Sequence, residues 1–248
     1  MPIVIGPQSF TLGTLASPTD PGRTLVASRR HTVGLLLIQL GIAVGGAYFQ
    51  SRPSAGPDLA PSHSGIVPLY ASMIALEWGL VWYVWGGIRD KGYRLLDLVG
   101  GRWGSWKNVA VDVAIALPFW EVWEATARAV HFALGENHAK SVQVLLPQTA
   151  LEIVLWIALS ASAGVCEEIV FRGYFQRQFR AFTGSTALAV VLQGLVFGGG
   201  HAYQGMKQVI VISVLGVLYG ILAAWRKNLR PGMIAHTCSD VVGGLLGK

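Results

Sequence analysis

Charged residues are scarce in this chain of 248 residues, because Asp, Glu, Lys and Arg together make up only 13% of it. An average soluble domain contains about 25%. Hydrophobic residues account for 52%, nine residues are Trp, and the mean hydropathy is +0.50. The shortage of charge excludes an ordinary soluble domain and indicates a protein that crosses a membrane several times.

Cysteine is also rare, with only Cys166 and Cys238 in the chain, and both lie in apolar segments. Two such residues exclude the disulfide framework of a small secreted domain. A free cysteine in an apolar segment ordinarily packs as a small hydrophobic side chain, and we favour this interpretation over a catalytic thiol.

The chain has a modest excess of positive charge, with 19 basic and 13 acidic side chains and a formal net charge of +6. The basic residues fall in short loops between apolar segments, and no basic and aromatic surface motif of a nucleic-acid-binding module is present. We therefore expect membrane lipids as partners and no nucleic acid.

Long apolar segments occur seven times, each close to the roughly 20 residues that a helix needs to cross a membrane. They predict an all-α fold, a polytopic transmembrane helix bundle of about seven spans, within a range of six to eight. The predicted spans are 32–50, 65–87, 109–134, 148–171, 186–205, 208–225 and 231–247.

Lys and Arg are distributed unevenly between the two sides of this layout. With the N-terminus inside, 14 of the 19 basic residues lie in inner segments and four in outer segments, while Arg128 lies within a span. Because inner loops carry the excess of basic residues, the distribution predicts a cytoplasmic N-terminus. Residues 1–30 would then form an N-terminal cytoplasmic tail, and residues 31–147 the N-terminal transmembrane helices.

Two connecting segments have distinct compositions. Residues 51–64 are rich in Pro and Ser and indicate an external loop. Residues 88–108 mix Arg, Lys, Leu and Trp. This segment is either an amphipathic element along the inner membrane surface or a plain basic loop.

Two adjacent glutamates, Glu167 and Glu168, follow the apolar run IVLWIALSASAGV. A charged side chain at the bilayer centre costs at least about 2.5 kcal/mol, so such residues suggest a functional site. On a helix the two point about 100° apart. Arg172 lies four residues after Glu168 and predicts an ion pair with it, which leaves Glu167 to face a cavity. The structural alternative is that both glutamates bind Arg172 and Arg177.

His201 follows Phe197 and three glycines in the next apolar segment. The turn between the two segments is expected at residues 182–185, around Gly184. Glu167 lies 17 residues before Gly184 and His201 lies 17 residues after it, so in an antiparallel hairpin both stand roughly 25 Å from the turn. The two side chains should therefore be in contact.

The last apolar segment contains His236 and Asp240, four residues apart on one helical face. A carboxylate can fix an imidazole tautomer or help to hold a metal, and the alternative is a closed packing pair. Straight-helix counting places His236 only about 10 Å from the inner end of its span, well below His201. The two histidines meet only if the hairpin protrudes into the cytoplasm or if the helix breaks at Gly198–Gly200.

A further acidic and basic group lies in the third predicted span. Glu124 and Arg128 are four residues apart and predict a structural ion pair. Glu121 lies three residues earlier and is predicted to face the same cavity as Glu167, without a catalytic assignment.

Three elements in this order resemble the CPBP family of intramembrane proteases, which includes Rce1-like type II CAAX prenyl proteases and Abi proteins. The family signature is EExxxR, then FxxxH, then HxxxN or HxxxD. The chain has Glu167-Glu168-Ile-Val-Phe-Arg172, then Phe197-Gly-Gly-Gly-His201, then His236-Thr-Cys-Ser-Asp240. The resemblance covers about residues 148–247 and implies that residues 148–248 are the catalytic helices. Asp at position 240, instead of Asn, is similar to bacterial members.

The resemblance implies endopeptidase activity on a membrane-associated substrate, and it leaves open whether that substrate is a prenylated CAAX protein. Glu167 would act as general base on a water that His201 holds. His236, oriented by Asp240, would donate to the developing oxyanion. Glu168, Arg172 and Phe197 would support these residues.

No metal cofactor is expected, because no HExxH helix is present. The alternative is a zinc enzyme in which Glu167, His201 and His236 bind the metal and leave one position open.

Two functions of other classes remain open. One is an ion-coupled transporter with a proton relay, although no internal repeat is visible. The other is a non-catalytic immunity or scaffold protein. We expect the bacterial plasma membrane as the location, because the sequence shows no organelle targeting signal and resembles bacterial members.

Overall fold

The computed structural model describes residues 24–51, 65–135 and 145–246, and among these residues it contains helices and no strands. The longer helices are α1 (Arg29–Ser51), α2 (Ile66–Arg89), α4 (Trp106–Leu134), α9 (Met206–Arg226) and α10 (Arg230–Leu246). Shorter elements are α3 (Leu95–Val99) and the 3-10 turn η4 (Ala202–Gln204). The predicted all-α helix bundle is confirmed.

The two helices that carry the Glu167-Glu168 and His201 motifs form a hairpin. The first runs continuously from α6 (Ala150–Glu167) through the π-helix η3 (Glu168–Phe175) into α7 (Gln176–Thr183). Gly184 then adopts φ 71°, a left-handed conformation that suits glycine, and ends α7. Ser185 caps the next helix, α8 (Thr186–Gly200), by accepting a hydrogen bond from the Leu188 amide.

Helix ends agree with local sequence signals elsewhere in the bundle. Thr149 and Glu152 form a reciprocal capping box at the start of α6. Ser105 accepts a hydrogen bond from the amide of Asn108 at the start of α4. These signals place the helix boundaries within a few residues of the predicted spans.

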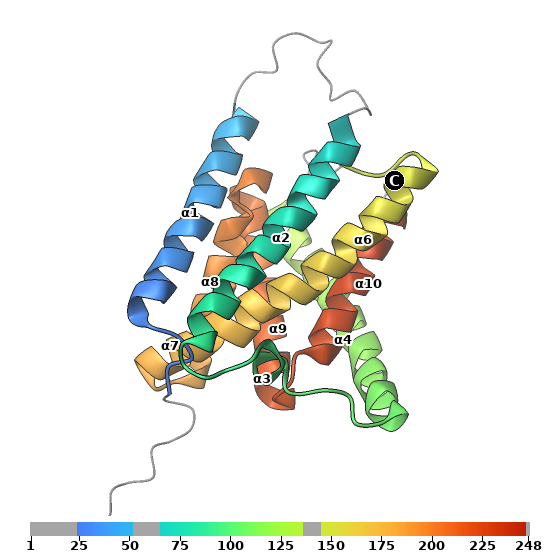
Figure 1. The fold of residues 1–248 in the computed structure, drawn as a ribbon. Coiled ribbons are helices and arrows are strands. Elements are labelled where there is room, and N and C mark those ends of the chain that lie inside the picture. Colours follow the sequence, from blue (N-terminus) through green and yellow to red (C-terminus); the bar gives the residue numbers. More distant parts are fainter. Residues whose placement is uncertain (1–23, 52–64, 136–144, 247–248) are drawn as a thin grey trace, which may run out of the picture.

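The arrangement of the helices is visible in Figure 1. Helix α6 crosses the bundle diagonally, with α2 and α10 packed against it, while α8 packs closely against α9. Helix α4 lies to one side, against α9 and α10. The start of α1 and the end of α10 lie at opposite ends of the bundle.

Small residues let α8 and α9 approach each other closely. A Cβ at Gly194 would lie 2.8 Å from Val217 Cγ2, and a Cβ at Gly198 would lie 2.5 Å from the Val209 carbonyl oxygen. Close backbone approach through small residues is typical of helix pairs in membranes, where apolar burial alone favours no helix contact over lipid.

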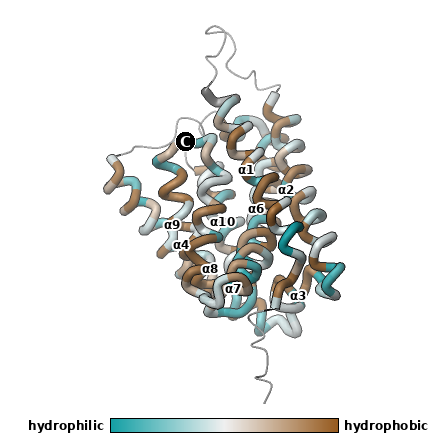
Figure 2. The backbone as a smooth tube through the Cα atoms, turned by 90° about the vertical axis from the view of Figure 1, so that its left-hand side faces the viewer, coloured by the Kyte–Doolittle hydropathy of each residue, from teal (hydrophilic) through white to brown (hydrophobic). Residues whose placement is uncertain are grey.

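Hydrophobic residues recur along most helices of the bundle, as Figure 2 shows. Large apolar side chains on different helices are more than half exposed, among them Leu37, Trp82, Leu151 and Trp225. So large an exposed apolar surface is unfavourable in water and suits lipid. The chain is therefore an integral membrane protein.

Four helical segments in the described part of the chain are long and apolar enough to cross a membrane: Arg29–Tyr48, Ile66–Arg89, Ala150–Thr183 and Met206–Arg226. Helix α8 is apolar but shorter. Helices α4 and α10 occupy the other two predicted spans. Each predicted apolar segment thus forms a helix, and the total of seven spans stays a prediction.

The structure describes only part of the predicted connecting segments. Residues 1–23 of the expected tail and residues 52–64 of the expected external loop lie outside the described residues, and α1 already begins at Arg29. Segment 88–108 contains the single-turn helix α3, which buries Leu98 completely. Both cysteines are free, and Cys166 is fully buried.

Candidate active site

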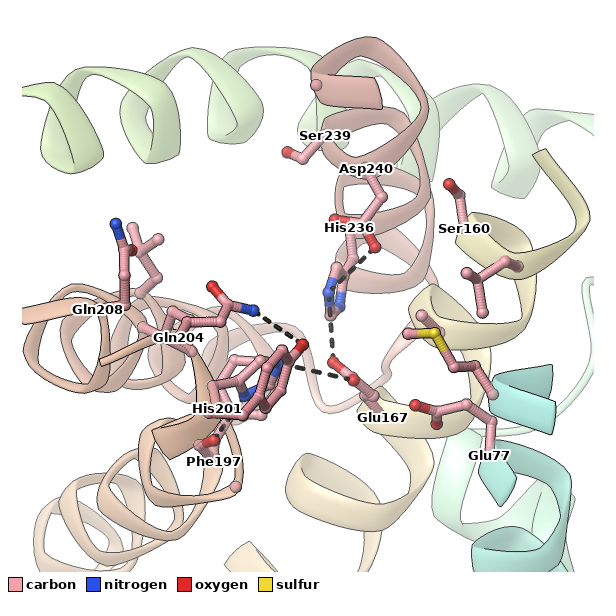
Figure 3. Close-up of a pocket in the computed structure, with 18 of the residues that line it drawn as sticks. Glu77, Ser160, Glu167, Phe197, His201, Gln204, Gln208, His236, Ser239 and Asp240 are labelled. Atoms are coloured by element: carbon pink, nitrogen blue, oxygen red, sulfur yellow. Dashed lines mark hydrogen bonds and ion pairs between the residues drawn. The ribbon is translucent and has the colours of Figure 1, made fainter. Parts of the chain in front are cut away.

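Polar side chains from three helical segments meet in the interior of the bundle, as Figure 3 shows. Glu167 lies at the end of α6, His201 directly after α8, and His236 and Asp240 on α10. Glu167 Oε1 lies 4.0 Å from His201 Nε2, and Glu167 Oε2 lies 3.4 Å from His236 Nε2. The structure thus brings together the four residues that the sequence singles out as catalytic candidates.

The hairpin symmetry accounts for the first of these contacts. Glu167 lies near the middle of the continuous helix 150–183, and His201 stands opposite it at the end of α8. The 17-residue counting on each side of Gly184 therefore predicts the contact correctly.

The contact between Glu167 and His236 has a cause that residue counting misses. Helix α8 stays helical through Gly198–Gly200, so it does not break there. Instead α6 runs obliquely through the bundle (Figure 1), so counting along straight, parallel helices does not give the relative levels of Glu167 and His236. The protrusion of the hairpin into the cytoplasm stays a prediction.

Glu168 and Arg172 form a buried ion pair, as their spacing predicts. Glu168 Oε1 lies 3.1 Å from Arg172 Nη1, and the two side chains are 1% and 0% exposed. The Arg172 guanidinium also lies over the ring of Phe197, 4.3 Å from its centroid, and donates to the Gly216 carbonyl oxygen at 3.3 Å. Pairing of this kind offsets the desolvation of two buried charges.

The pair lies in the π-helix, whose eight residues are all buried. A π-helical turn closes with i→i+5 hydrogen bonds, so residues four apart, such as Glu168 and Arg172, lie nearly one above the other. Such segments occur frequently at functional sites. The other predicted partner, Arg177, instead donates to the Leu98 carbonyl oxygen at 3.0 Å, so the alternative that it binds the glutamates is wrong.

His236 is held by carboxylates on both sides of its ring. Its Nδ1 lies 3.3 Å from Glu168 Oε1, while its Nε2 lies 3.4 Å from Glu167 Oε2 and 3.8 Å from Asp240 Oδ2. The ring also stacks on Tyr219, with 5.1 Å between the centroids. Because ionised carboxylates only accept hydrogen bonds, this geometry favours donation from both ring nitrogens.

His201 has a different environment. Its Nδ1 donates to the Phe197 carbonyl oxygen at 2.9 Å, and its ring makes an edge contact with the Phe197 ring at 4.9 Å. A carbonyl oxygen only accepts, so in the neutral imidazole the proton is on Nδ1 and the Nε2 lone pair faces Glu167. His201 and Glu167 are 20% and 13% exposed, whereas Glu168 is almost completely covered. The first two can therefore contact a molecule in the cavity.

Two glycines allow α10 to approach this cluster. A Cβ at Gly164 on α6 would lie 2.8 Å from the backbone nitrogen of Thr237, and a Cβ at Gly232 on α10 would lie 3.0 Å from Glu168 Oε2. Larger side chains at either position would separate α10 from the glutamates.

The cluster opens into a cavity of about 820 Å³. This volume is in the range of small-molecule and peptide sites. Its walls away from the cluster are mainly apolar and come from α2, α4, α6 and α9. Among the lining residues are Leu69, Met73, Leu76, Leu80, Trp123, Trp156, Leu159 and Leu215.

Glu77 is a site residue that the sequence reasoning missed. It lies on α2, lines the same cavity and interacts electrostatically with Glu167 and Asp240. A glutamate within the apolar segment 65–87 is itself a signal, because ionisable residues inside membranes are usually functional. Glu77 could therefore have been recognised as a candidate from the sequence alone.

Glu121, in contrast, does not face the cavity. Its side chain is exposed on α4, which lines the cavity with Trp123, Ala127 and His131. The prediction for Glu121 is wrong because the face that α4 turns inward depends on its packing against α9 and α10. The predicted ion pair on α4 is present, with 3.6 Å between Glu124 Oε2 and Arg128 Nη1.

The alternative metal ligands were Glu167, His201 and His236. Among the described residues, no group of three or more His, Cys, Asp or Glu side chains is placed to hold a metal ion. His236 Nε2 lies 3.4 Å from Glu167 Oε2 and 3.8 Å from Asp240 Oδ2, and a proton on this nitrogen would leave no lone pair for a metal. The absence of a metal cofactor stays a prediction.

Comparison with known families adds independent support. Residues 148–242 match the family described as Type II CAAX prenyl endopeptidase Rce1-like. The resemblance that the three motifs predict is confirmed. No curated protein and no solved structure matches the chain.

The Rce1-like region, residues 148–242, contains all four catalytic candidates and the Glu168–Arg172 pair. It supports an intramembrane CAAX-type endopeptidase, a hydrolase that acts on a membrane-anchored substrate. Glu77 lies outside this region, on α2.

Proposed function

We propose that the protein is an intramembrane endopeptidase that hydrolyses a peptide bond with a water activated by Glu167. The observation that carries this proposal is the convergence of a carboxylate and two imidazoles, from three separate helices, on one cavity inside the bundle. Charged and polar groups are costly there, so their convergence requires a function.

The distance between Glu167 and His201 suits a bound water. At 4.0 Å the two side chains are too far apart for a direct hydrogen bond, and a water between them can donate one hydrogen to Glu167 and the other to His201 Nε2. Both hydrogens are then engaged, and the lone pairs of the oxygen are free to attack a carbonyl carbon. Glu167 acts as the general base.

His236 stabilises the negative charge that develops on the carbonyl oxygen of the substrate. Its Nε2–H, beside Glu167, can donate to the carbonyl oxygen as that oxygen becomes an oxyanion. Asp240 and Glu168 orient the ring from either side, and Arg172 fixes Glu168 in turn. The supporting residues thus act through His236.

The reaction balances with these groups alone. The water oxygen bonds to the carbonyl carbon while one of its protons passes to Glu167. The tetrahedral intermediate then collapses, the carbon–nitrogen bond breaks, and Glu167 returns the proton to the leaving amine nitrogen. Glu167 is regenerated as a carboxylate, and the products are a carboxylic acid and an amine, between which a proton passes to give a carboxylate and an ammonium group.

We propose that this mechanism needs no cofactor, and a zinc enzyme with Glu167, His201 and His236 as ligands is the competing mechanism. The donor geometry of His236 supports the metal-free mechanism. The substrate is a peptide held at the membrane, with a prenylated CAAX protein as one candidate. The location is the bacterial plasma membrane, with the N-terminus cytoplasmic.

A cleavage assay tests these statements. Purified wild-type protein in detergent is given a fluorogenic peptide library, with and without a farnesylated C-terminal cysteine, in the presence and absence of a strong zinc chelator. Cleavage that the chelator leaves unchanged supports the metal-free mechanism. Loss on chelation with recovery on added zinc supports the zinc enzyme and contradicts ours. Absence of cleavage by folded protein favours a transporter or a non-catalytic immunity protein.

A further inference from the structure

Several polar side chains in the cavity wall have no role in the chemistry described above, and two of them are Gln39 and Ser160. Gln39 on α1 is 6% exposed and Ser160 on α6 is 2% exposed, and both line the cavity. Within the described part of the chain, Gln39 Nε2 and Ser160 Oγ have no hydrogen-bond partner. Buried polar atoms in native proteins nearly always have partners, so these two require an explanation.

Their surroundings make the lack of partners more costly. The cavity wall on α2 contains Leu69, Met73, Leu76 and Leu80, which offer no polar side-chain atom for hydrogen bonding, and its polar side chains are Tyr70 and Glu77. A peptide that enters this cavity faces the same difficulty, because each residue of its main chain carries an amide donor and a carbonyl acceptor. In apolar surroundings these groups must be paired.

The two side chains match this need chemically. The amide nitrogen of Gln39 donates, as a peptide carbonyl requires, and the hydroxyl of Ser160 can donate or accept. We propose that Gln39 and Ser160 bind the main chain of an extended peptide substrate on either side of the cleaved bond. The inference rests on the proposed peptidase function and adds how its substrate is recognised.

The positions predict where along the substrate each contact lies. A Cβ at Gly200, the neighbour of His201, would lie 3.5 Å from Gln39 Oε1, so Gln39 stands beside the water-binding residue. Ser160 lies two helical turns before Glu167 on α6, roughly 10 Å away along the axis. An extended peptide covers that distance in about three residues. Gln39 therefore contacts the main chain next to the cleaved bond, and Ser160 contacts it about three residues away.

Recognition of this kind gives affinity without sequence preference. Main-chain groups are common to all peptides, so selectivity among substrates comes from the apolar walls of the cavity. The substrate class is thus an extended, apolar peptide segment, with its main chain paired at two positions.

Peptide binding to the full-length Glu167→Gln variant tests the inference without requiring cleavage. The probe is the library peptide that wild type cleaves fastest or, without cleavage, the member that binds tightest. Gln39→Leu and Ser160→Ala, each added to Glu167→Gln, should weaken its binding by about threefold to tenfold, the worth of one ordinary hydrogen bond. Ser162→Ala is the matched control, because Ser162 lies on α6 with Ser160, accepts a hydrogen bond from Trp78 Nε1 of α2 and does not line the cavity.

A scan of the peptide with single amide-to-ester replacements locates the contacts. We expect two sensitive positions about three residues apart, and Ser160→Ala should abolish the sensitivity of the more distant one. Equal binding by all variants, failure of every peptide to bind, or an ester scan with no sensitive position overturns the inference. Thermal unfolding checks that each variant is folded.

The outcome is separable from that of the proposed function. Cleavage by wild type together with unchanged binding by Gln39→Leu and Ser160→Ala overturns the inference and leaves the peptidase intact. If Gln39→Leu and Ser160→Ala weaken peptide binding and wild type cleaves no peptide, the result supports main-chain recognition and contradicts the peptidase function.

Discussion

Glu168 Oε1 is shared between two buried cations or donors, Arg172 Nη1 at 3.1 Å and His236 Nδ1 at 3.3 Å. The residue therefore links an ion pair inside one long helix to the imidazole of another. Glu168 does not open into the cavity as Glu167 does, so its influence on any reaction passes through His236. Substitution of Glu168 should therefore affect catalysis through His236.

Glu168→Gln should lower kcat strongly and leave KM nearly unchanged, because the substitution alters the orientation of His236 and not the cavity wall. It also leaves the Arg172 charge buried without its carboxylate, which should destabilise the fold by roughly 3–5 kcal/mol. Adding Arg172→Met should recover much of the stability and none of the activity. Thermal unfolding and steady-state kinetics measure the two effects, and recovery of both together would contradict the assignment of Glu168 to His236.

Glu77 should help Glu167 to act as general base. Its carboxyl group lines the same cavity and interacts with the Glu167 side chain, so it can position that carboxylate beside the water. Glu77→Gln and Glu77→Leu should each lower kcat by about tenfold, with little change in KM. Single-turnover cleavage rates report the step directly. Full activity in both variants would show that Glu77 is only part of the cavity wall.

Gly164→Ala should reduce both stability and activity, because the new methyl group would meet the Thr237 backbone of α10. Separation of α6 and α10 moves His236 away from Glu167. Gly79→Ala on α2 is the matched control, since a Cβ at Gly79 has nothing within 4 Å and Gly79 does not line the cavity. Thermal unfolding and cleavage rates should distinguish the two alanine variants, and equal behaviour would argue against close approach of α6 and α10.

The sequence predicts the helices and one catalytic contact well, because both follow from local properties. Hydropathy locates every long helix, and turn chemistry at Gly184 sets the register between Glu167 and His201. The level of His236 relative to Glu167 was wrong in the straight-helix picture, since the tilt of α6 results from packing against several other helices. The contact of Glu168 with His236 was missed for the same reason.

Helix faces were predicted less reliably than helix positions. Glu121 and Glu77 are both glutamates within apolar segments, yet only Glu77 faces the cavity. The acidic residues of an apolar segment do not by themselves tell which of its faces packs inward. That information lies in the neighbouring helices, which for α4 are α9 and α10.

The central claim is that Glu167 activates the attacking water, and the rate of peptide cleavage by Glu167→Gln tests it most directly. Glu121→Gln is the matched control, because it removes a glutamate charge from the exposed face of α4. With both variants folded as wild type, Glu167→Gln should lose about 10²- to 10⁴-fold in kcat, the usual contribution of a general base. Glu121→Gln should cleave at the wild-type rate. Cleavage by Glu167→Gln at the rate of wild type, or an equal loss in both variants, would contradict the account.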